Sequence, residues 1–529
     1  MPVPTAPAGT VDALACEYAA IVLEHAPPTA TALGLHDRNA ELPVPTQARI
    51  DAYERALRDL RARVDAHAAE GMDAELDRKG LRAILDAALA GFELQRPWER
   101  DPLSWARAPV EAVFLVLLRE HLPEEERRAG VAGRCAAIPD YLAAARQLLV
   151  PAAVPPAWTA LASASAAGGA SFLRDVVAGF APEAEDAVAA AADALESFGA
   201  WVTDTLAPEA GGAYVAGEQT LQRLLRDVHL LDEGPAEVAA RGQLLLARCE
   251  DALVDAAGAA DWRAALERAR AARPTMDELV PAYRREFQQL EEFCFEHDLV
   301  TDPGAPATLK ATPEFLRPLM GYAAYLPPGA FEEVRTGELW VTPPPAPDGL
   351  ADHSYAALQP ITAHEGYPGH HLQLTSVGAL GSVVRRLRGG SSLMTEGWGL
   401  YTEELMHETG YYTPEGRLAQ LALTAMRAAR IVVDMGLHTG DMTVDEGIDL
   451  LVDRAGMSRT TATSEVLRYT MMPTQPFTYL YGAEEIRRIR ATWRERTGGS
   501  LRAFHDALLA YGHLPPALVA RALLDGDAA

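Results

Sequence analysis

The sequence has few cysteines and no long hydrophobic run. Its four cysteines lie far apart and form no C-x-x-C pair, which argues against a redox or metal-binding cysteine pair and favours reduced, mostly buried thiols. No stretch approaches 18 uninterrupted apolar residues, so no membrane span is predicted. The N-terminal segment has neither a basic stretch nor a long apolar core, so we expect no signal peptide and a cytoplasmic location.

Basic residues are also scarce relative to acidic ones. The chain has 47 Lys and Arg against 74 Asp and Glu, a formal net charge of −27, which argues against nucleic acid or an anionic membrane as partner. Hydrophobic residues at 49% and charged residues at 23% are typical of a globular protein. A chain of 529 residues predicts two or more subdomains and leaves the oligomeric state open.

The hydrophobic pattern predicts a mainly α fold. Helical spacing recurs through the first 300 residues, and the abundance of Ala supports helix there. We expect helices over 11–24, 47–69, 73–92, 109–121, 136–149, 181–205, 217–228, 235–257 and 276–297. Residues 1–300 carry no chemical motif, so we expect an N-terminal helical region that lines a cleft.

The pattern changes after residue 300. Residues 305–312 and 337–343 look like short strands bounded by Pro or Gly, and helical patterns return from residue 360. We therefore expect a second region, 301–529, that combines a small β-sheet with helices and carries the chemistry.

The octapeptide HEGYPGHH at residues 364–371 is the strongest chemical signal. In the zinc-peptidase motif H-E-x-x-H, two histidines one helical turn apart bind Zn²⁺ and the glutamate is the general base. Here His364 and Glu365 open the motif, but Pro368 occupies the position of the second histidine. The next histidines are His370 and His371.

The spacing requires a break in the helix. On an unbroken helix His370 would lie about 120° around the axis from His364, and His371 would lie about 10 Å along it. Pro368 lacks a backbone N–H, so a local bulge of two residues is expected, and it would bring His370 to the position of the second ligand. His370 is the first choice, and His371 remains the alternative.

Catalytic zinc needs a third protein ligand. Glu396 lies in the first turns of a helix expected over 391–407, and we take it as that ligand, although most such glutamates are solvated. Gly397 and Gly399 beside it would permit the close approach of another element.

Several ordered blocks then resemble one bacterial family. Five ordered blocks are similar to the domain of unknown function 885 (DUF885), which is grouped with gluzincin-type zinc metallopeptidases: HEGYPGHHLQ, TEGWGLYTEEL, RAARIVVDMGLH, EVLRY followed by PTQPFTYLYG, and LRAFHDALLAYGHLPP. The resemblance covers nearly the whole chain. It implies one Zn²⁺ ion and a two-lobed helical metallopeptidase-like fold around a deep cleft, with a small β-sheet near the active site.

The resemblance also implies roles for further residues. Tyr479 is the first choice to stabilise the oxyanion and Tyr481 the second, and Gln475 would shape the same loop. Related peptidases often carry an Asp four residues after the glutamate ligand, where this chain has Leu400. Glu403, on the same helix face as Glu396, would orient a histidine ligand or lie on the surface.

Four other residues recur in the resembling blocks. They would bind a substrate carboxylate or brace the cleft, and salt bridges between packed helices are the plainer alternative. They are Arg430, His438, Arg468 and His505.

The function predicted from these residues is hydrolysis of a peptide or peptide-like amide by metal-activated water, with Glu365 as general base. A non-haem iron oxygenase uses the same two-His-one-carboxylate ligand set, but it does not need the glutamate after the first histidine. A non-catalytic pseudo-peptidase that only binds its ligand is the third hypothesis, and the intact Glu365 argues against it. The sequence names no individual substrate.

Overall fold

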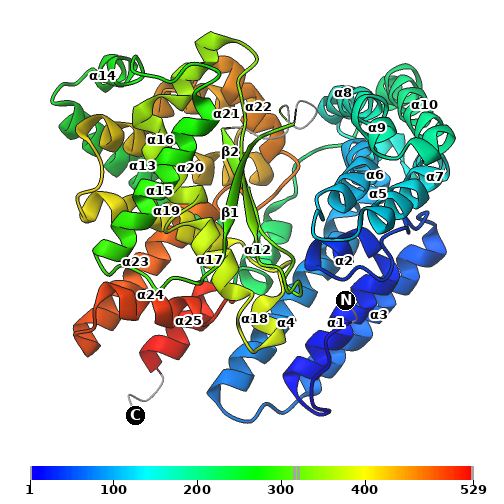
Figure 1. Ribbon diagram of the computed structural model, residues 1–529, viewed down its shortest axis with the longest axis horizontal. Coiled ribbons are helices and arrows are strands. Elements are labelled where there is room, and N and C mark those ends of the chain that lie inside the picture. The colour runs from blue at the N-terminus through cyan, green and yellow to red at the C-terminus, as the bar shows by residue number, and fades with distance from the viewer. Residues whose placement is uncertain (1–2, 314–316, 318–321, 526–529) are drawn as a thin grey trace. The chain divides into compact units, whose positions relative to one another are not determined.

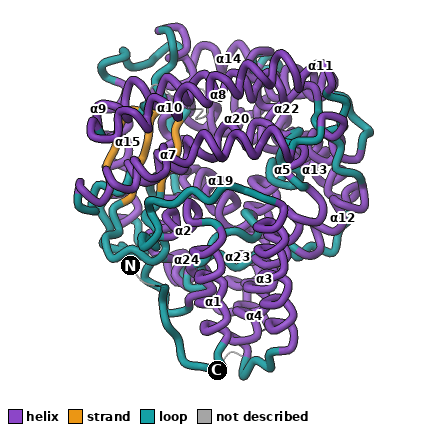
Figure 2. Tube along the Cα trace, turned by 90° about the vertical axis from the view of Figure 1, so that its right-hand side faces the viewer, coloured by secondary structure: helices purple, strands orange, loops and turns teal. Residues whose placement is uncertain are grey.

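The computed structural model describes residues 3–313, 317 and 322–525. The described chain is mainly helical, as predicted, and Figure 2 shows its few strands in one small part of a trace that is otherwise helix and loop. None of the helices in these ranges combines the length and apolarity that a bilayer span requires. Contacts divide the chain into two compact units, each described here by itself.

The first unit comprises Met1–Ala69, Ala88–Tyr214 and Gly329–Val334. Its central helices are packed against one another with small residues at their contacts: a side chain at Gly169 would lie 2.7 Å from Val110. The stretch of small residues at 163–171 therefore forms a closely packed helix. Its main helices are α1 Val11–His25, α2 Pro27–Leu33, α3 Gln47–Ala66, α6 Pro102–Leu117, α7 Glu124–Leu148, α8 Pro156–Phe172 and α10 Glu185–Trp201.

The second unit comprises Glu70–Ala87, Val215–Pro328 and Arg335–Ala529. Its described helices begin with most of α4 (Met72–Ala90) and continue from residue 218. They include α12 Glu218–Asp227, α13 Pro235–Ala257, α14 Trp262–Ala269, α15 Leu279–Glu296, α16 Tyr355–Glu365, α17 His370–Val377, α18 Val383–Arg386, α19 Leu393–Glu408, α20 Pro414–Thr439, α21 Val444–Ala455, α22 Arg459–Tyr469, α23 Thr478–Thr497, α24 Leu501–Leu509 and α25 Pro516–Ala520. The boundaries of the two compact units therefore do not coincide with the change of sequence pattern near residue 300.

Helix α20 is the central helix of the second unit. The Thr413 hydroxyl accepts the Gly416 N–H at its start, and Gly440, at φ +88°, ends it in the left-handed region. Helices α13, α16 and α21 pack on it. At the α13 contact a side chain on Gly242 would lie 2.7 Å from Ile431, so only glycine allows this spacing.

Three strands form a small sheet of order β1-β3-β2 in the second unit (Figure 1). Strands β1 (Ala307–Ala311) and β3 (Gly337–Val341) pair in parallel, which confirms both strand predictions. Strand β2 (Ala323–Leu326) pairs antiparallel with β3 and was not predicted, because four residues give almost no periodicity. Strand β2 is therefore at an edge of the sheet.

Helix boundaries differ most from prediction where proline lies inside a helix. The pattern placed a helix start at Pro109, yet α6 begins at Pro102, with Asp101 accepting the Ser104 N–H at its N-terminus. Pro109 is buried within α6, where packing of the apolar face outweighs the lost hydrogen bond.

Candidate metal centre

The HEGYPGHH segment lies across a gap between two helices. Helix α16 ends at Glu365 and α17 begins at His370, with Gly366 and Gly369 as the residues that flank the intervening turn. The spacing of the motif is thus accommodated by a short loop between separate helices instead of the expected two-residue bulge in one helix.

This loop is held from the side by a tryptophan. The Trp398 indole N–H lies 2.8 Å from the Pro368 carbonyl oxygen and 3.2 Å from that of Gly369, and the ring is fully buried. At Gly369 itself a side chain would collide with the main chain of Ala363 and His364. Trp398 and Gly369 therefore fix the path of the loop, and with it the direction in which α17 starts.

Two histidines and one glutamate converge at this loop. Glu396 Oε2 lies 3.8 Å from His364 Nε2 and 3.6 Å from His370 Nε2. The two imidazole rings stand nearly perpendicular, with centroids 4.7 Å apart. One ligand atom from each of the three residues lies within 4.8 Å of the others. The structure thus brings together His364, His370 and Glu396.

Glycines on α19 allow Glu396 to approach. A side chain at Gly399 would lie 2.6 Å from the His364 ring, and one at Gly397 would lie 2.5 Å from the backbone of Gly482 on α23. The expected close approach at both glycines is confirmed. The Gly397–Gly482 contact also brings the first turns of α23 against α19.

The ring of His364 is oriented by a second glutamate. Its Nδ1 lies 2.9 Å from Glu403 Oε1, and Glu403 is completely buried. Burial alone would lower the pKa of His364, but Glu396, Glu403 and Glu365 together raise this pKa to about 9. Burial likewise opposes ionisation of Glu396, yet the two histidines keep its pKa below the usual value, so the site holds a carboxylate.

His371 points away from this cluster. Its Nδ1 lies 3.0 Å from the Tyr325 hydroxyl and its Nε2 3.0 Å from the Ala305 carbonyl oxygen. Burial lowers the pKa of His371 to about 4, which keeps the ring neutral. Both ring nitrogens have partners in the protein, so the structure places His370, and not His371, among the candidate ligands.

Glu365 follows His364 directly and lies at the sheet. Its Oε2 accepts the backbone N–H of Tyr325 on edge strand β2 at 3.0 Å. Sequence reasoning did not identify Tyr325, because any residue type can supply a backbone N–H and no side-chain signal marks it. The hydrogen bond fixes one carboxylate oxygen of Glu365.

Tyr479, in the first turn of α23, lies beside the cluster. Its ring is nearly parallel to that of His364, with centroids 6.3 Å apart, and the Arg430 guanidinium lies 5.0 Å from its centroid. Burial, together with the negative charge of Glu396, raises the pKa of Tyr479, although Arg430, Arg468 and the Gln475 side chain oppose the shift. Tyr479 therefore keeps its proton and remains a hydrogen-bond donor.

The alternative tyrosine lies elsewhere. The Tyr481 hydroxyl donates to Glu233 at 2.7 Å, and the Arg241 guanidinium stacks 4.2 Å from its ring centroid. Tyr481 therefore contributes to the packing of α23 against residues 233–241.

The remaining candidates make contacts between packed elements. Arg430 and Arg468 both donate to Glu465, at 2.7 and 2.9 Å, and Arg430 also donates to the Tyr469 hydroxyl. His438 Nε2 lies 3.0 Å from the Tyr469 carbonyl oxygen. These contacts form a charged cluster that borders Tyr479 through Arg430.

His505 is enclosed on both ring nitrogens. Its Nε2 lies 2.6 Å from the Tyr401 hydroxyl and its Nδ1 2.7 Å from the Leu299 carbonyl oxygen. Burial lowers the pKa of His505 to about 4. Its partners assign it to helix packing.

The donor set and its spacing fit Zn²⁺. With metal–ligand bonds of about 2.0–2.2 Å, two ligand atoms of a tetrahedral site lie about 3.3 Å apart. The Glu396 oxygen lies slightly farther than this from both histidine nitrogens, beyond the usual length of a direct hydrogen bond. Two imidazoles, a carboxylate and a buried carboxylate behind one imidazole form the donor pattern that proteins use for catalytic zinc.

Two solved structures share this fold. A "putative lipoprotein of unknown function" from Shewanella oneidensis is 21% identical, with a TM-score of 0.79 over 97% of this chain and 100% of that chain. A "putative lipoprotein" from Colwellia psychrerythraea is 17% identical, with a TM-score of 0.81 over 97% and 98%. These likenesses show the fold. No curated protein matches the chain.

The sequence itself matches a family model over residues 27–523, and that model describes bacterial proteins of unknown function. Because the match spans nearly the whole chain, this protein belongs to the DUF885 family.

Proposed function

We propose that this protein is a zinc-dependent hydrolase that cleaves a peptide or peptide-like amide bond. The observation that carries the proposal is the convergence of His364, His370 and Glu396, with Glu365 immediately after the first histidine. Gluzincin-type membership and a deep substrate cleft, both implied by the family resemblance, form part of the same proposal.

His364, His370 and Glu396 would hold the ion, and Glu403 fixes the His364 ring so that Nε2 faces the other two ligands. A bound Zn²⁺ supplies Lewis-acid polarisation of the carbonyl and a lowered pKa for water. Glu365 takes the proton of the attacking water and later passes it to the leaving amine. The Tyr325 N–H holds one oxygen of this carboxylate in place during both transfers.

Tyr479 is assigned to the developing oxyanion. Its raised pKa keeps the phenol protonated, so the hydroxyl can donate a hydrogen bond where negative charge accumulates. Arg430 on the ring face is a fixed positive charge beside this position. Removal of one oxyanion donor typically costs about 10²–10³ in kcat.

The hydrolase is tested by metal analysis together with digestion of a library of short peptides. The purified wild type should carry zinc and cleave, whereas Glu365→Gln should retain zinc and lose cleavage. Glu404→Gln is the matched control for this substitution. It makes the same change at a glutamate that pairs with Arg417 at 2.6 Å. A protein without zinc at this site, or one that holds iron instead, contradicts the proposal.

A second test separates the two tyrosines. Tyr479→Phe should lower kcat by about 10²-fold with little change in KM, and Tyr481→Phe should leave both unchanged. Equal effects of the two substitutions would remove Tyr479 from the mechanism.

A cytoplasmic location remains a prediction for this chain, and cell fractionation tests it.

A further inference from the structure

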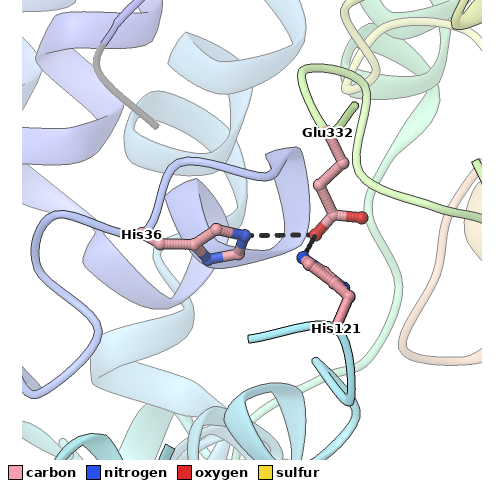
Figure 3. Close-up of side chains that lie close together, drawn as sticks. All are labelled: His36, His121 and Glu332. Atoms are coloured by element: carbon pink, nitrogen blue, oxygen red, sulfur yellow. Dashed lines mark hydrogen bonds and ion pairs between the residues drawn. The ribbon is translucent and has the colours of Figure 1, made fainter. Parts of the chain in front are cut away.

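A second group of two histidines and one glutamate lies in the first unit, outside the candidate metal centre. Figure 3 shows His36, His121 and Glu332 with their polar atoms turned toward one another, and one ligand atom of each lies within 4.8 Å of the others. His36 follows α2, His121 lies between α6 and α7, and Glu332 lies in the Gly329–Val334 segment between β2 and β3. Residues so far apart in sequence form no recognisable motif.

The distances around Glu332 Oε1 are those of ligand atoms around an ion. His36 Nε2 lies 3.2 Å away and His121 Nε2 3.7 Å away. Ligand atoms of a tetrahedral zinc site are about 3.3 Å apart. Only the His36 contact is short enough for a hydrogen bond, and His121 lies at ion-pair distance.

The carboxylate and the first histidine are held by further contacts. Glu332 Oε2 accepts the Gly329 N–H at 2.8 Å, which leaves Oε1 to face the histidines. Asn39 lies within hydrogen-bonding distance of His36 Nδ1, so Nε2 is the nitrogen turned to the cluster. The side chains of Glu332 and His36 are only 4% and 7% exposed. Such outer partners are typical of metal ligands.

The backbone around Glu332 is fixed just as closely. The Phe331 N–H donates to the Leu33 carbonyl oxygen at 2.9 Å. A side chain on Gly329 would lie 2.6 Å from the Gly34 nitrogen, and one on Gly34, at φ +89°, would lie 2.7 Å from the Glu332 side chain. Glycine at both positions lets the two backbones touch, which holds Glu332 opposite His36 before any ligand binds.

We propose that His36, His121 and Glu332 form a second zinc-binding site, with His36 Nε2, His121 Nε2 and Glu332 Oε1 as ligands. Two imidazoles and one carboxylate suit Zn²⁺ among the common divalent ions. Although burial would raise the pKa of Glu332, His36, Arg119, the Gly329 N–H and His121 lower it, so the ligand is already an anion. The His121 side chain is 26% exposed, which gives solvent access to the remaining coordination position.

Arg119 is the competing cation at this site. Its Nε lies 3.3 Å from Glu332 Oε1 but does not form a hydrogen bond in the part of the chain that the structure describes. Arg119 therefore interacts with Glu332 through charge and without an aligned hydrogen bond. Its misalignment leaves Oε1 available, and its positive charge should weaken metal binding.

The test counts zinc ions bound by the full-length chain in equilibrium dialysis against Zn²⁺ alone. In a background of His364→Gln with His370→Gln, which removes the candidate catalytic ligands, one zinc ion per chain should remain. Adding His121→Gln should abolish it. Because this background lacks two of the candidate catalytic ligands, zinc binding in it reports on the second site alone. The result therefore does not depend on whether the proposed hydrolase is correct.

Arg119→Gln provides a second measurement in the same background. Removal of the competing charge should tighten the remaining zinc site, and zinc should raise the thermal unfolding temperature more than it does with Arg119 present. The proposal is overturned if that background binds no zinc, if His121→Gln retains the ion in a folded chain, or if Arg119→Gln leaves the affinity unchanged or weaker.

Discussion

Glu403 offers the sharpest test of the candidate metal centre, because it acts on a ligand without touching the metal. Its Oε1 lies 2.9 Å from His364 Nδ1 and 3.6 Å from Arg427 Nη2, and its side chain is completely buried. Glu403→Gln keeps the size of the side chain and removes its charge. We predict weaker zinc binding with the fold retained.

The size of the effect follows from these contacts. A buried hydrogen bond to a charged group contributes about 1.5–3 kcal/mol, and a neutral one about 0.5–1.5 kcal/mol. Replacing the charged hydrogen bond with a neutral one therefore costs about 1–1.5 kcal/mol, which lowers the affinity for zinc about tenfold. Arg427, left without its anion, adds unfavourable positive charge near the site, so the loss should lie between about tenfold and a hundredfold.

The assay is competition for Zn²⁺ with a coloured chelator of known affinity, at fixed pH and ionic strength. Glu404→Gln is again the control, since this neighbouring side chain pairs with Arg417. The control should bind zinc as the wild type does. If Glu403→Gln also binds as tightly as wild type, Glu403 does not orient a metal ligand and the assignment of His364 loses its support.

Three further predictions test the surroundings of the site. Gly399→Ala should weaken zinc binding by at least about tenfold, because the added methyl would lie 2.6 Å from the His364 ring; Gly168→Ala, at a helical position with open space, should not. Trp398→Phe should lower the free energy of unfolding in urea by about 1–3 kcal/mol, since it leaves buried carbonyl oxygens without their donor. If stability is unchanged, the tryptophan does not hold the loop. The pKa of His505 is about 4 in the folded state and about 6.5 in the unfolded state. The free energy of unfolding should therefore be highest above about pH 6.5 and fall by about 3 kcal/mol as the pH drops toward 4. His505→Gln should show a correspondingly shallower dependence in urea titrations at pH 7 and 5, and an unaltered slope would contradict this origin.

Much of the local structure could be predicted from the sequence. Helical periodicity gave the mainly α fold, and short apolar runs between Pro and Gly gave β1 and β3. Strand β2 and the start of α6 were missed, because a strand of four residues lacks a period and a buried proline can remain inside a helix. These errors lie where tertiary packing outweighs local preference.

The sequence by itself determined which residue types are available at the candidate site: three histidines, the glutamate adjacent to the first, and a later glutamate close to two glycines. Only the tertiary structure decided between His370 and His371, because that choice depends on the loop path that Trp398 fixes from a helix about thirty residues away. It likewise placed Tyr479 beside His364, through the glycine contact between α19 and α23. The cluster of His36, His121 and Glu332 exists only in the folded chain. Periodicity reports local conformation, whereas these juxtapositions arise from long-range packing.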